Sequence, residues 1–484
     1  MAFCACKQTA NDSLSVDIFQ TSSSGDKLTQ KQRHKVEAPD VTISIRPTDQ
    51  FQTITGFGGA FTESSAYVLD KLPDSVRTGV INSYFGDEGA QYSLTRTHMN
   101  SCDFSIDHYS YAPVKDDTAL EHFTIEPDLD DLVPMIKDAQ ATSSQGFKIV
   151  ASPWTAPPWM KDNNHWYGGK LLNQYYSTWA RFFVKYQEAY AAHGIPIWAF
   201  TVENEPLGNN SNWESMHYTP EEMARFVTEY LGPELKKTQT DTKLLVYDQN
   251  RGKELDEWAG KLLTDTALLP HIYGTAVHWY TSTYDYFGAS LTRTHDLAPE
   301  KHLLHTEGCI DAEVPKWNND AWYWSKEATD WGWDWATEED KVYHPKYIPA
   351  YRYARDIIGC LNNWVEGWID WNMVLDRQGG PNLANNWCVA PVIADTATGE
   401  VYYTPLYYII SHFSKFIRPG AIRIGHEVST TEIMTTSVSN PDGSIVTVLF
   451  NPTSEEKTIE IKIDDEIIGT TISKEAVQTL ILRP

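Results

Sequence analysis

Short apolar runs alternate with helical segments from about Phe57 to Trp371, which is the pattern of repeated βα units. Eight runs have the length and composition of buried strands. They are "ITGFGGAF", "YSLTRTHM", "FKIVASPW", "IWAFTVENEP", "KLLVYDQN", "GTAVHWY", "HLLHTEG" and "VEGWIDWN". Eight strands that alternate with helices predict an α/β fold of the (β/α)₈ TIM-barrel type.

Two of the intervening segments carry clear helix boundaries. "TPEEMARFVTEYLGPEL" opens on Thr219, Pro220 and Glu222, an N-cap residue followed by a proline and by the glutamate of a capping box. "YYSTWARFFVKYQEAYAAHG" ends on Gly194, which suits a helix C-terminus. These boundaries support helices between the predicted strands.

The alternation has a period of two at both ends of the chain, which predicts strands without helices. After about Tyr402 it runs through "EIMTTSVSN", "SIVTVLFN", "KTIEIKI" and "AVQTLILRP", with "NPDGS" as a hairpin turn. We predict a C-terminal β-sandwich that also takes in N-terminal strands, since domain termini often lie close together. The expected divisions are a tail with the first sandwich strand or strands at 1–40, a strand leading into the barrel at 41–55, the barrel at 56–400 and the sandwich at 401–484.

Composition narrows the class of partner. The 484 residues carry 39 Lys plus Arg against 65 Asp plus Glu, a formal charge of −26, which argues against a nucleic-acid partner. Aromatic residues make up 13%, with 18 Trp and 26 Tyr. Such rings fill cores and also stack on sugars, so they suit a neutral carbohydrate ligand without requiring one.

The cysteines bear on the redox state of the protein, and the N-terminal segment bears on its cellular location. The six cysteines are dispersed without the paired spacing of a zinc site, so we expect most to be free, with one or two bridges left open. No apolar run reaches the roughly 18 residues of a membrane span. "MAFCACKQTANDS" resembles the end of a bacterial lipoprotein signal, with Cys6 as the candidate anchor, and predicts a secreted or envelope-associated protein. An ordinary disordered terminus is the alternative.

Carboxylates end two of the predicted strands. Glu205 closes "TVENEP" on the fourth strand and Glu307 closes "LLHTEG" on the seventh. Barrel chemistry gathers at the carboxyl ends of strands, so the two groups should face each other across one cavity. Facing carboxyls cleave glycosidic bonds, with retention of configuration when they lie about 5 to 5.5 Å apart. The sequence does not fix that separation.

The acid and the nucleophile need different surroundings. An acid keeps its proton when burial and a neighbouring carboxylate raise its pKa, whereas a nucleophile needs hydrogen-bond donors, for which Tyr280 is a candidate. Strand alternation would put Glu203 and Glu205 on one face and Asn204 on the other. Position at the strand end favours Glu205 over Glu203. A structural carboxylate that caps a loop or pairs with an arginine is the alternative for this motif.

With these residues in place, the chain resembles glycoside hydrolase family 30, the group of glucosylceramidases and β-1,6-glucanases, from about Gly56 to the C-terminus. The order and length of the matching stretches make the resemblance specific. They are "GFGGAFTESSA", "TRTHMNSCDFS", "ASPWTAPPWMK", "TVENEP", "AVHWY", "TEGC", "GWIDWNMVLDRQGGPN" and "HFSKFIRPG".

The resemblance implies a role for each site residue. Glu205 would be the acid/base and Glu307 the nucleophile. Arg96 would orient the nucleophile, with a structural ion pair as the alternative, and His278 could orient a site residue through its second nitrogen or be a core histidine. The residues implied to hold the sugar are Asp103, Trp154, Asn204, Trp371 and Asn386, with Asn385 as the alternative alignment for Asn386. From its place at the end of the sixth strand, we count Tyr280 among the substrate-binding residues as well.

We expect neither a cofactor nor a metal. Cys102 beside Asp103 and Cys309 close to Glu307 offer too few regularly spaced ligands for a metal site. The sequence departs from the family pattern after the seventh strand, where tryptophans are concentrated. Trp317, Trp322, Trp324, Trp331, Trp333 and Trp335 would form a sugar-stacking wall, a lid, or a loop that packs onto the barrel or a partner chain.

These observations favour a retaining hydrolase of β-glucosides, with glucosylceramide, β-1,6-glucan or another small β-glucoside as substrate. The "TEGC" and "LDRQGGPN" stretches favour the glucanase branch slightly. A β-xylosidase or β-fucosidase of the same family is one alternative, because sugar identity depends on contacts worth about 1 to 3 kcal/mol each. A non-catalytic glycan-binding protein on the same scaffold is the other. The sequence does not predict an oligomeric state.

Overall fold

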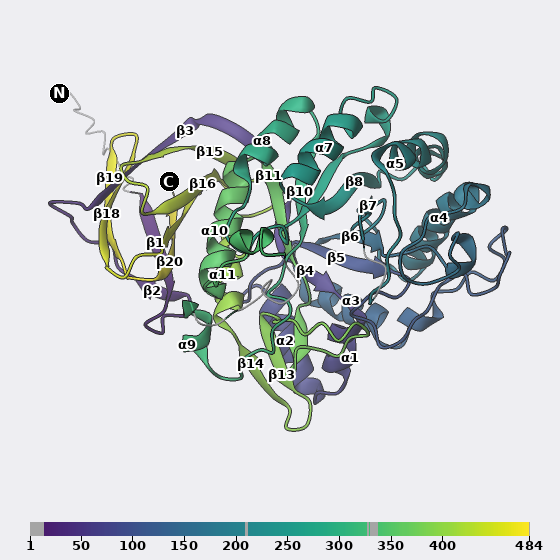
Figure 1. Cartoon of the computed structure of the whole chain (residues 1–484). Helices are drawn as coiled ribbons and strands as arrows, with labels where there is room; N and C mark the ends of the chain where they lie inside the picture. The colour runs from purple at the N-terminus through teal and green to yellow at the C-terminus, as the bar shows by residue number, and fades with distance from the viewer. Residues whose placement is uncertain (1–13, 209–211, 327–328, 330–336, 484) are drawn as a thin grey trace, which may run out of the picture.

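The computed structural model describes residues 14–208, 212–326, 329 and 337–483. Its centre is a closed barrel of eight parallel strands, seen on the right of Figure 1. This confirms the predicted fold class and all eight predicted strands. The strands are β4 (Gly56–Phe61), β5 (Leu94–Met99), β6 (Lys148–Pro153), β7 (Ala199–Thr201), β8 (Lys243–Asn250), β9 (Gly274–His278), β10 (His302–Glu307) and β11 (Val365–Asp370).

Side chains fill the barrel in layers. One layer is a cluster of small and branched apolar residues from seven different strands, and its members are Leu94, Val150, Ala199, Leu245, Ala276, Leu304 and Ile369. Two positions further along five of these strands the inward side chains are polar and fully buried, namely Arg96, Ser152, Thr201, His278 and Thr306. The apolar layer therefore forms a floor, and the polar layer above it lies towards the carboxyl ends of the strands.

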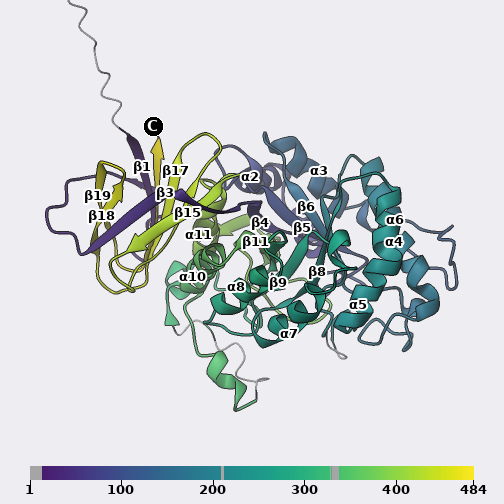
Figure 2. The same cartoon turned by 90° about the horizontal axis from the view of Figure 1, so that it is seen from above.

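Helices surround the barrel, as Figure 2 shows from above. They are α1 (Glu63–Asp70), α2 (Asp74–Phe85), α3 (Leu132–Thr142), α4 (Tyr176–Ala192), α5 (Pro220–Phe226), α6 (Gly232–Lys237), α7 (Lys253–Leu262), α8 (Gly288–Leu297), α10 (Pro349–Asn362) and α11 (Pro405–Ser414). The predicted capping box is present at α5, where the Thr219 hydroxyl accepts from the Glu222 amide and the Glu222 carboxylate accepts from the Thr219 amide. A π-helical turn at Val227–Leu231 joins α5 to α6.

A second, all-β domain lies beside the barrel and contains strands from both ends of the chain. Its nine-stranded sheet has the order β19-β18-β3-β15-β16-β17-β20-β1-β2 and folds around its own apolar core (Figure 1). The strands are β1 (Ser15–Ser22), β2 (Thr29–Lys31), β3 (Val41–Thr53), β15 (Ile422–Val428), β16 (Met434–Ser439), β17 (Ile445–Asn451), β18 (Lys457–Ile463), β19 (Glu466–Ile472) and β20 (Ala476–Arg483). The predicted sharing of N-terminal strands is confirmed.

The boundary between the two domains differs from the prediction. Helix α11 occupies the start of the segment 401–484, where we expected only strands, and it packs against barrel strand β4. Its Pro405 at the first turn and its apolar "PLYYII" run suit a buried helix. The barrel therefore extends through α11, and the C-terminal part of the sandwich begins at Ile422.

Helices α10 and α11 form the surface on which the sandwich packs. Tyr351 of α10 donates to the Pro452 carbonyl at 2.9 Å, and Asn362 donates to the Thr435 carbonyl at 2.8 Å. His412 of α11 is fully buried between the hydroxyls of Thr21 and Thr479. Burial lowers the pKa of His412 to about 3, so it joins the two domains as a neutral imidazole.

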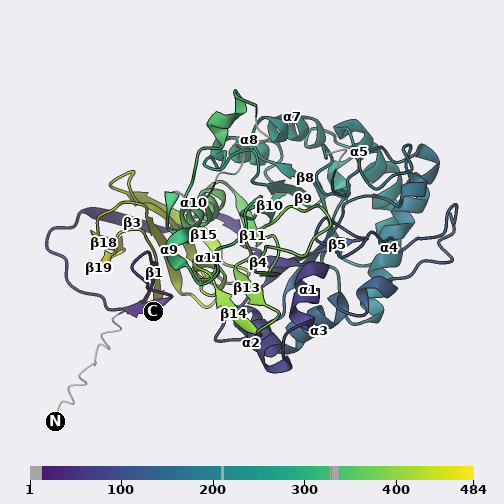
Figure 3. The ribbon, with the colours of Figure 1, turned by 60° about the horizontal axis from the view of Figure 1, so that its bottom comes forward.

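A small sheet of β12 (Val374–Asp376), β13 (Val392–Asp395) and β14 (Glu400–Tyr403) follows the last barrel strand, and the short helix α9 (Asp320–Tyr323) precedes α10. Figure 3 shows β13 and β14 below the barrel strands. No helix among the described residues is long and apolar enough to cross a membrane. Cys6, the candidate lipid anchor, lies outside the described residues, so that hypothesis stays a prediction.

Candidate active site

Arg96 lies at the centre of the buried polar layer and binds three acidic or amide side chains. Its guanidinium donates to a carboxylate oxygen of Glu307, to Asn204 Oδ1 at 2.8 Å and to Asp248 Oδ2 at 2.7 Å. The Nε atom donates to Ser152 Oγ at 3.0 Å. Burial opposes the charge of Arg96, but Asp248 and Glu307 outweigh it and raise the pKa of the guanidinium. Arg96 is therefore a fixed positive charge beneath Glu307.

Asp248 reaches this layer because strand β8 contains a bulge. The pairing of β8 with β9 shifts between Tyr247 and Gln249, and both Tyr247 and Asp248 have positive φ, at 75° and 56°. A bulge of this kind re-aims a side chain that regular alternation would direct elsewhere. Burial raises the pKa of Asp248, but Arg96 and His278 outweigh it and hold the pKa well below its usual value. Asp248 is thus a permanent anion in the barrel interior.

Glu205 lies beyond the end of its strand rather than on it. Strand β7 stops at Thr201, and Glu205 adopts a left-handed backbone with φ of 48°. Its amide donates to the Asp248 carbonyl at 3.0 Å, and the Gly208 amide donates back to the Glu205 carbonyl at 2.6 Å, so the turn is fixed by neighbouring backbone. The turn carries the side chain into the cavity, where its exposed fraction is 15%.

This geometry corrects the alternation predicted for "TVENEP". Asn204 and Glu205 both line the cavity, whereas Glu203 is fully buried outside it. Period-two alternation fails here because the backbone leaves the extended conformation after Thr201. Burial raises the pKa of Glu203 well above its usual value, with Lys161 opposing the shift. The preference for Glu205 over Glu203 therefore agrees with the positions of the two side chains, although not for the reason of strand register.

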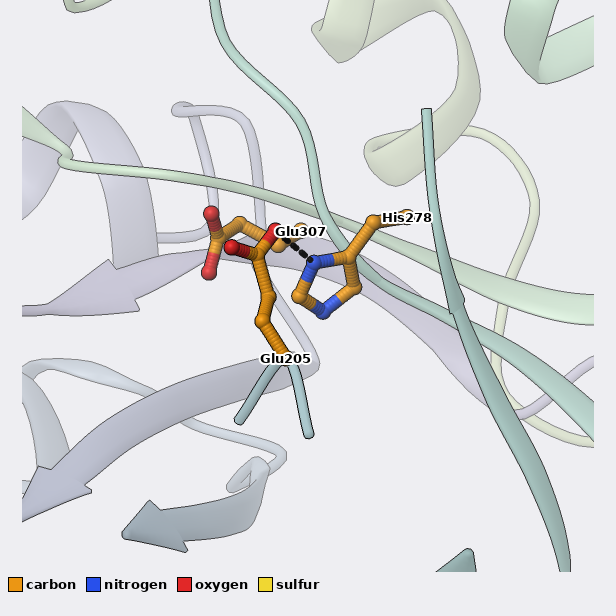
Figure 4. Close-up of side chains that lie close together, drawn as sticks. All are labelled: Glu205, His278 and Glu307. Atoms are coloured by element: carbon orange, nitrogen blue, oxygen red, sulfur yellow. Dashed lines mark hydrogen bonds and ion pairs between the residues drawn. The ribbon is translucent and has the colours of Figure 1, made fainter. Parts of the chain in front are cut away.

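Glu205 and Glu307 face each other, as Figure 4 shows. An oxygen of each carboxyl group and a nitrogen of His278 all lie within 4.8 Å of one another. Tyr280 donates its hydroxyl to Glu307 Oε1 at 3.0 Å, while Arg96 holds the other oxygen. This closeness agrees with a retaining pair, whose carboxyl groups lie about 5 to 5.5 Å apart, rather than with an inverting pair at about 6.5 to 9.5 Å.

The two carboxyls have different neighbours. Burial raises the pKa of the Glu307 carboxyl, and the positive charges of His278 and Arg96 act in the opposite direction. Glu205 instead faces His278 Nδ1 at 3.1 Å, and the other ring nitrogen of His278 lies 3.0 Å from Asp248 Oδ1. Burial disfavours a charged His278, but Glu307 and Asp248 outweigh it and raise its pKa to about 9.

The same three side chains, Glu205, His278 and Glu307, could each offer one ligand atom to a metal ion. Arg96 already places a positive charge on Glu307, and His278 shares a hydrogen bond with Glu205 and another with Asp248. A dication beside two cationic groups would be repelled, and its imidazole ligand would first have to lose a proton. The chemistry of this cluster therefore suits an acid/base pair rather than a metal site.

The pair opens into a cavity of about 590 Å³ whose size suits a small ligand. Eight residues singled out in the sequence lie on its wall. They are Asp103, Trp154, Asn204, Glu205, Tyr280, Glu307, Trp371 and Asn386. The other two, Arg96 and His278, lie behind the wall and contact it through Glu307 and Glu205. The structure thus brings residues from distant parts of the chain to one site.

Aromatic and polar groups on the wall offer contacts for a sugar. Trp154 and Trp371 stack with ring centroids 5.2 Å apart. Asp103 has a buried Oδ1 atom without a hydrogen-bond partner among the described residues, and burial, with the charges of Glu307 and Glu214, raises the pKa of this carboxyl. A ligand hydroxyl could satisfy that oxygen. Asn385 and Asn386 both line the cavity, so the alternative alignment between them stays open.

Sequence reasoning missed several residues of the site. Asp248 organises Arg96 and His278, and Trp213, Gln249, Asn250 and Cys388 line the cavity. The strand "KLLVYDQN" ends in three polar residues, so the reasoning that selected "TVENEP" could have found this strand as well. The position of Trp213, in contrast, depends on the course of the loop after β7.

The tryptophan-rich segment is only partly described, and three of its six tryptophans have a defined position. Trp317 packs edge-on against Tyr402, and Trp324 is buried against Tyr351. Trp322 packs against Tyr323 of α9. None of these three lines the cavity, so they attach the loop to the barrel rather than form a sugar-stacking wall. Trp331, Trp333 and Trp335 lie outside the described residues.

A TIM barrel that carries two facing carboxyls at the carboxyl ends of its strands has the architecture of a retaining glycoside hydrolase. The sequence comparison agrees with the geometry. Residues 54–417 match the Glycosyl hydrolase family 30 TIM-barrel domain, and residues 420–480 match the family's β-sandwich domain. The chain belongs to glycoside hydrolase family 30, and it is a glycosidase.

Relatives and solved structures cover nearly the whole chain. The lysosomal acid glucosylceramidase of Mus musculus is 34% identical over 437 residues, covering 88% of this chain and 80% of that protein. The endo-1,6-beta-D-glucanase of Neurospora crassa is 28% identical and covers 91% and 88%. Among solved structures, SrfJ from Salmonella typhimurium superimposes with a TM-score of 0.86 at 28% identity, over 97% and 100% of the two chains. The endo-β1,6-glucanase BT3312 gives 0.81 at 29%, over 96% and 99%.

Proposed function

We propose that this protein hydrolyses the β-glucosidic bond of a glucosylceramide-like β-glucoside or of a β-1,6-glucan, with retention of configuration. The observation that carries the proposal is the close pair of Glu205 and Glu307, whose oxygens lie within 4.8 Å and whose neighbours differ. Relatives that share about a third of the sequence include a glucosylceramidase, and others include endo-1,6-β-glucanases. The family match therefore supports both substrate classes.

In the first step Glu307 attacks the anomeric carbon and Glu205 gives its proton to the glycosidic oxygen. The carbon–oxygen bond to the leaving group breaks as the glycosyl–enzyme ester forms. Arg96 and Tyr280 donate hydrogen bonds to Glu307, and these favour the ionised form that attacks. Since burial raises the pKa of Glu307, these donors are what make a buried nucleophile usable.

Glu205 and His278 together hold the proton for the leaving group. Their hydrogen bond of 3.1 Å needs one hydrogen, on the carboxyl or on the ring. Because the pKa of His278 is about 9, the ring carries both protons near neutral pH, so Nε2 donates to Asp248 and Nδ1 donates to Glu205. Asp248 keeps the ring oriented, and the Nδ1 proton can pass to Glu205 and from there to the glycosidic oxygen.

In the second step the unprotonated Glu205 takes a proton from water, and the oxygen of that water attacks the anomeric carbon. The ester bond to Glu307 breaks, and the sugar leaves with its original β configuration. Glu205 is again protonated and Glu307 is again ionised. Two inversions at the same carbon give net retention, and each step is balanced in protons.

Variants of Glu307 and Glu205, assayed on substrates with good and poor leaving groups, distinguish the nucleophile from the acid/base. We expect Glu307→Gln to lower turnover by several orders of magnitude on every substrate, as is common on loss of a nucleophile. Glu205→Gln should fail on substrates with poor leaving groups but keep measurable activity on a dinitrophenyl β-glucoside, which needs no proton from the enzyme. Azide should accelerate Glu205→Gln and yield β-glucosyl azide.

Several outcomes would contradict this assignment. Near-normal activity of Glu307→Gln would remove Glu307 from the nucleophile role. An α-glucosyl azide from Glu205→Gln would mean that the two residues exchange roles. Proton NMR of the product formed first from the wild-type protein should show the β anomer. An α anomer at that time would mean inversion and would contradict the retaining mechanism inferred from the close carboxyl pair.

A substrate panel decides between the substrate classes. Pustulan, gentiobiose, glucosylceramide and aryl β-glucosides test the two proposed classes, and aryl β-xylosides and β-fucosides test the alternatives from the same family. Oligosaccharides released from pustulan would indicate endo cleavage, whereas glucose alone would exclude it. Binding of sugar without turnover on any member of the panel would favour a glycan-binding protein instead.

A further inference from the structure

Two buried cysteines lie side by side on the cavity wall. The Sγ atoms of Cys309 and Cys388 are 3.6 Å apart, and both residues line the cavity that Glu205 and Glu307 share. Cys309 follows the end of β10 by two residues, and Cys388 lies in the segment before β13. Their exposed fractions are 2% and 1%, and both are thiols in this structure.

Backbone hydrogen bonds hold the two cysteine segments together. Ile310 and Val389, each next to a cysteine, form an antiparallel bridge in which the Val389 amide donates to the Ile310 carbonyl at 2.8 Å. The Glu313 amide also donates to the Trp387 carbonyl at 2.9 Å. The closeness of the two sulfurs is therefore fixed by backbone contacts that follow Cys309 in the chain and lie on both sides of Cys388.

The thiol pair contacts the proposed nucleophile through Tyr280. Cys309 Sγ lies 3.6 Å from the Tyr280 hydroxyl, which donates to Glu307. Cys388 Sγ lies 3.7 Å from the backbone carbonyl of Asn386, another residue of the cavity wall. Oxidation of the two sulfurs would therefore alter contacts of both Tyr280, which bonds the nucleophile, and Asn386, which lines the sugar cavity.

We infer that Cys309 and Cys388 form a dithiol–disulfide pair whose oxidation state changes the shape and activity of the sugar cavity. With hydrogen peroxide as the oxidant, one thiolate attacks a peroxide oxygen and releases hydroxide, and the second thiol displaces water from the resulting sulfenic acid. Two S–H bonds are replaced by one S–S bond, and the two electrons and two protons convert the peroxide to two waters.

A disulfide needs the sulfurs about 2.05 Å apart, so they must approach each other by roughly 1.5 Å from the present contact. A movement of Cys309 in this step alters its 3.6 Å contact with the Tyr280 hydroxyl. Burial raises the pKa of Cys388 to about 11 and raises that of Cys309 strongly. Because only the thiolate reacts, oxidation near neutral pH is slow, and the disulfide is formed over hours or during folding in an oxidising compartment.

The first test is chemical and does not depend on activity. A Cys4→Ser/Cys6→Ser background removes the other neighbouring cysteine pair in the sequence. This protein is incubated with hydrogen peroxide, denatured in N-ethylmaleimide and digested for mass spectrometry. We expect a cross-linked peptide that contains Cys309 and Cys388 and has lost two hydrogens. Its absence after full exposure to peroxide would overturn the inference, whatever the substrate proves to be.

The second test measures whether the disulfide changes the activity of the sugar cavity. On an aryl β-glucoside, the oxidised protein should show kcat/KM at least threefold below that of the reduced protein, with recovery in a phosphine reductant. Cys388→Ser should abolish both the cross-link and the reversible change. Cys360→Ser, a matched change at a buried cysteine that contacts Arg251 instead, should keep both. A cross-link with unchanged kinetics would overturn the inference that the disulfide changes the activity of the cavity. Lack of activity in both the oxidised and the reduced protein would instead contradict the proposed function.

Discussion

At the scale of single residues, the buried ion cluster of Arg96, Asp248, His278 and Glu307 is the feature that makes the carboxyl pair usable. A carboxylate buried in a barrel interior costs free energy unless it is paired and hydrogen-bonded. Arg96 and Tyr280 satisfy Glu307, and Asp248 in turn balances Arg96 and His278. Loss of one member therefore leaves an uncompensated charge, so its effect should exceed that of one hydrogen bond.

Tyr280→Phe should move the acidic limb of kcat/KM to higher pH. The hydroxyl of Tyr280 donates to Glu307 and so favours the carboxylate; without it, burial raises the pKa of Glu307 further. A hydrogen bond to a charged group is worth about 1.5 to 3 kcal/mol, which corresponds to about one or two pH units. The pH profile on an aryl β-glucoside measures the shift. Tyr402→Phe, which loses a hydroxyl bonded to Asp320 outside the cavity, is the control, and an unmoved limb in Tyr280→Phe would contradict the contact's role.

His278 should make stability depend on pH between its ordinary pKa of 6.5 and its folded pKa of about 9. Below pH 6.5 the ring is protonated in both states and its contribution is fully present; as the pH rises through about 9, the folded protein also loses the proton and the contribution disappears. The effect is on the order of 3 kcal/mol.

Thermal unfolding at pH 6 and at pH 9.5 tests this dependence. The wild-type melting temperature should fall further between these pH values than that of His278→Asn, which has no proton to lose. The exposed His34→Asn variant should follow the wild type. Equal falls in the wild type and in His278→Asn would show that His278 is not the titrating group.

At the scale of elements, strand β4 shows why the chain carries its "GFGG" run. A Cβ atom on Gly58 would lie 1.9 Å from the Leu94 carbonyl oxygen, and one on Gly59 would lie 3.1 Å from Met373. Real Cβ atoms never approach a backbone oxygen as closely as the first of these distances, so the first contact requires the backbone to move. The glycines of this motif therefore allow β4 and β5 to close the barrel beneath Arg96.

Gly58→Ala should disrupt barrel closure, because the clash is with backbone on the neighbouring strand. We expect little soluble protein, or a melting temperature lowered by many degrees. Gly79→Ala is the matched control, since its Cβ would meet nothing within 4 Å and it lies on the exposed part of α2. Removing a glycine from a helix should stabilise by about 0.5 to 1 kcal/mol. A soluble Gly58→Ala protein with the wild-type melting temperature would contradict this account of the motif.

At the scale of the whole molecule, the two ends of the chain meet in the sandwich. Strand β1 pairs with β20 over its full length, and its Ile18 is fully buried in the sandwich core. Thr21 also contacts His412 of the barrel helix α11. The sandwich therefore cannot be completed until the chain has been made in full, and it covers the helices α10 and α11.

Removal of residues 1–22, which include β1, should destabilise both domains. It would leave β20 as an unpaired edge and expose part of the sandwich core and the buried His412. Compared with removal of residues 1–13, which keeps β1 whole, we expect a melting temperature lower by several degrees and more aggregation. Calorimetry and light scattering measure the two effects, and identical behaviour of the two truncations would contradict the structural role of β1.

The periodicity of the sequence was sufficient to predict the barrel, its eight strands and the shared sandwich, because burial of a strand or helix face leaves a repeating apolar pattern. Strand-end carboxylates and the family motifs also selected Glu205 and Glu307. The end of the barrel was misplaced because the apolar run that forms α11 follows a strand and was taken as part of the β-rich segment.

The tertiary structure alone decided which side chains meet. The left-handed turn at Glu205 and the bulge at Asp248 break strand alternation, and both depend on backbone contacts between neighbouring strands that no local pattern contains. The sequence by itself determined where the barrel strands lie and which polar residues follow them, because each buried strand leaves an apolar run that stops at its end. The distances among Glu205, His278 and Glu307 follow from barrel closure, which brings Glu205 next to residues more than seventy positions further along the chain.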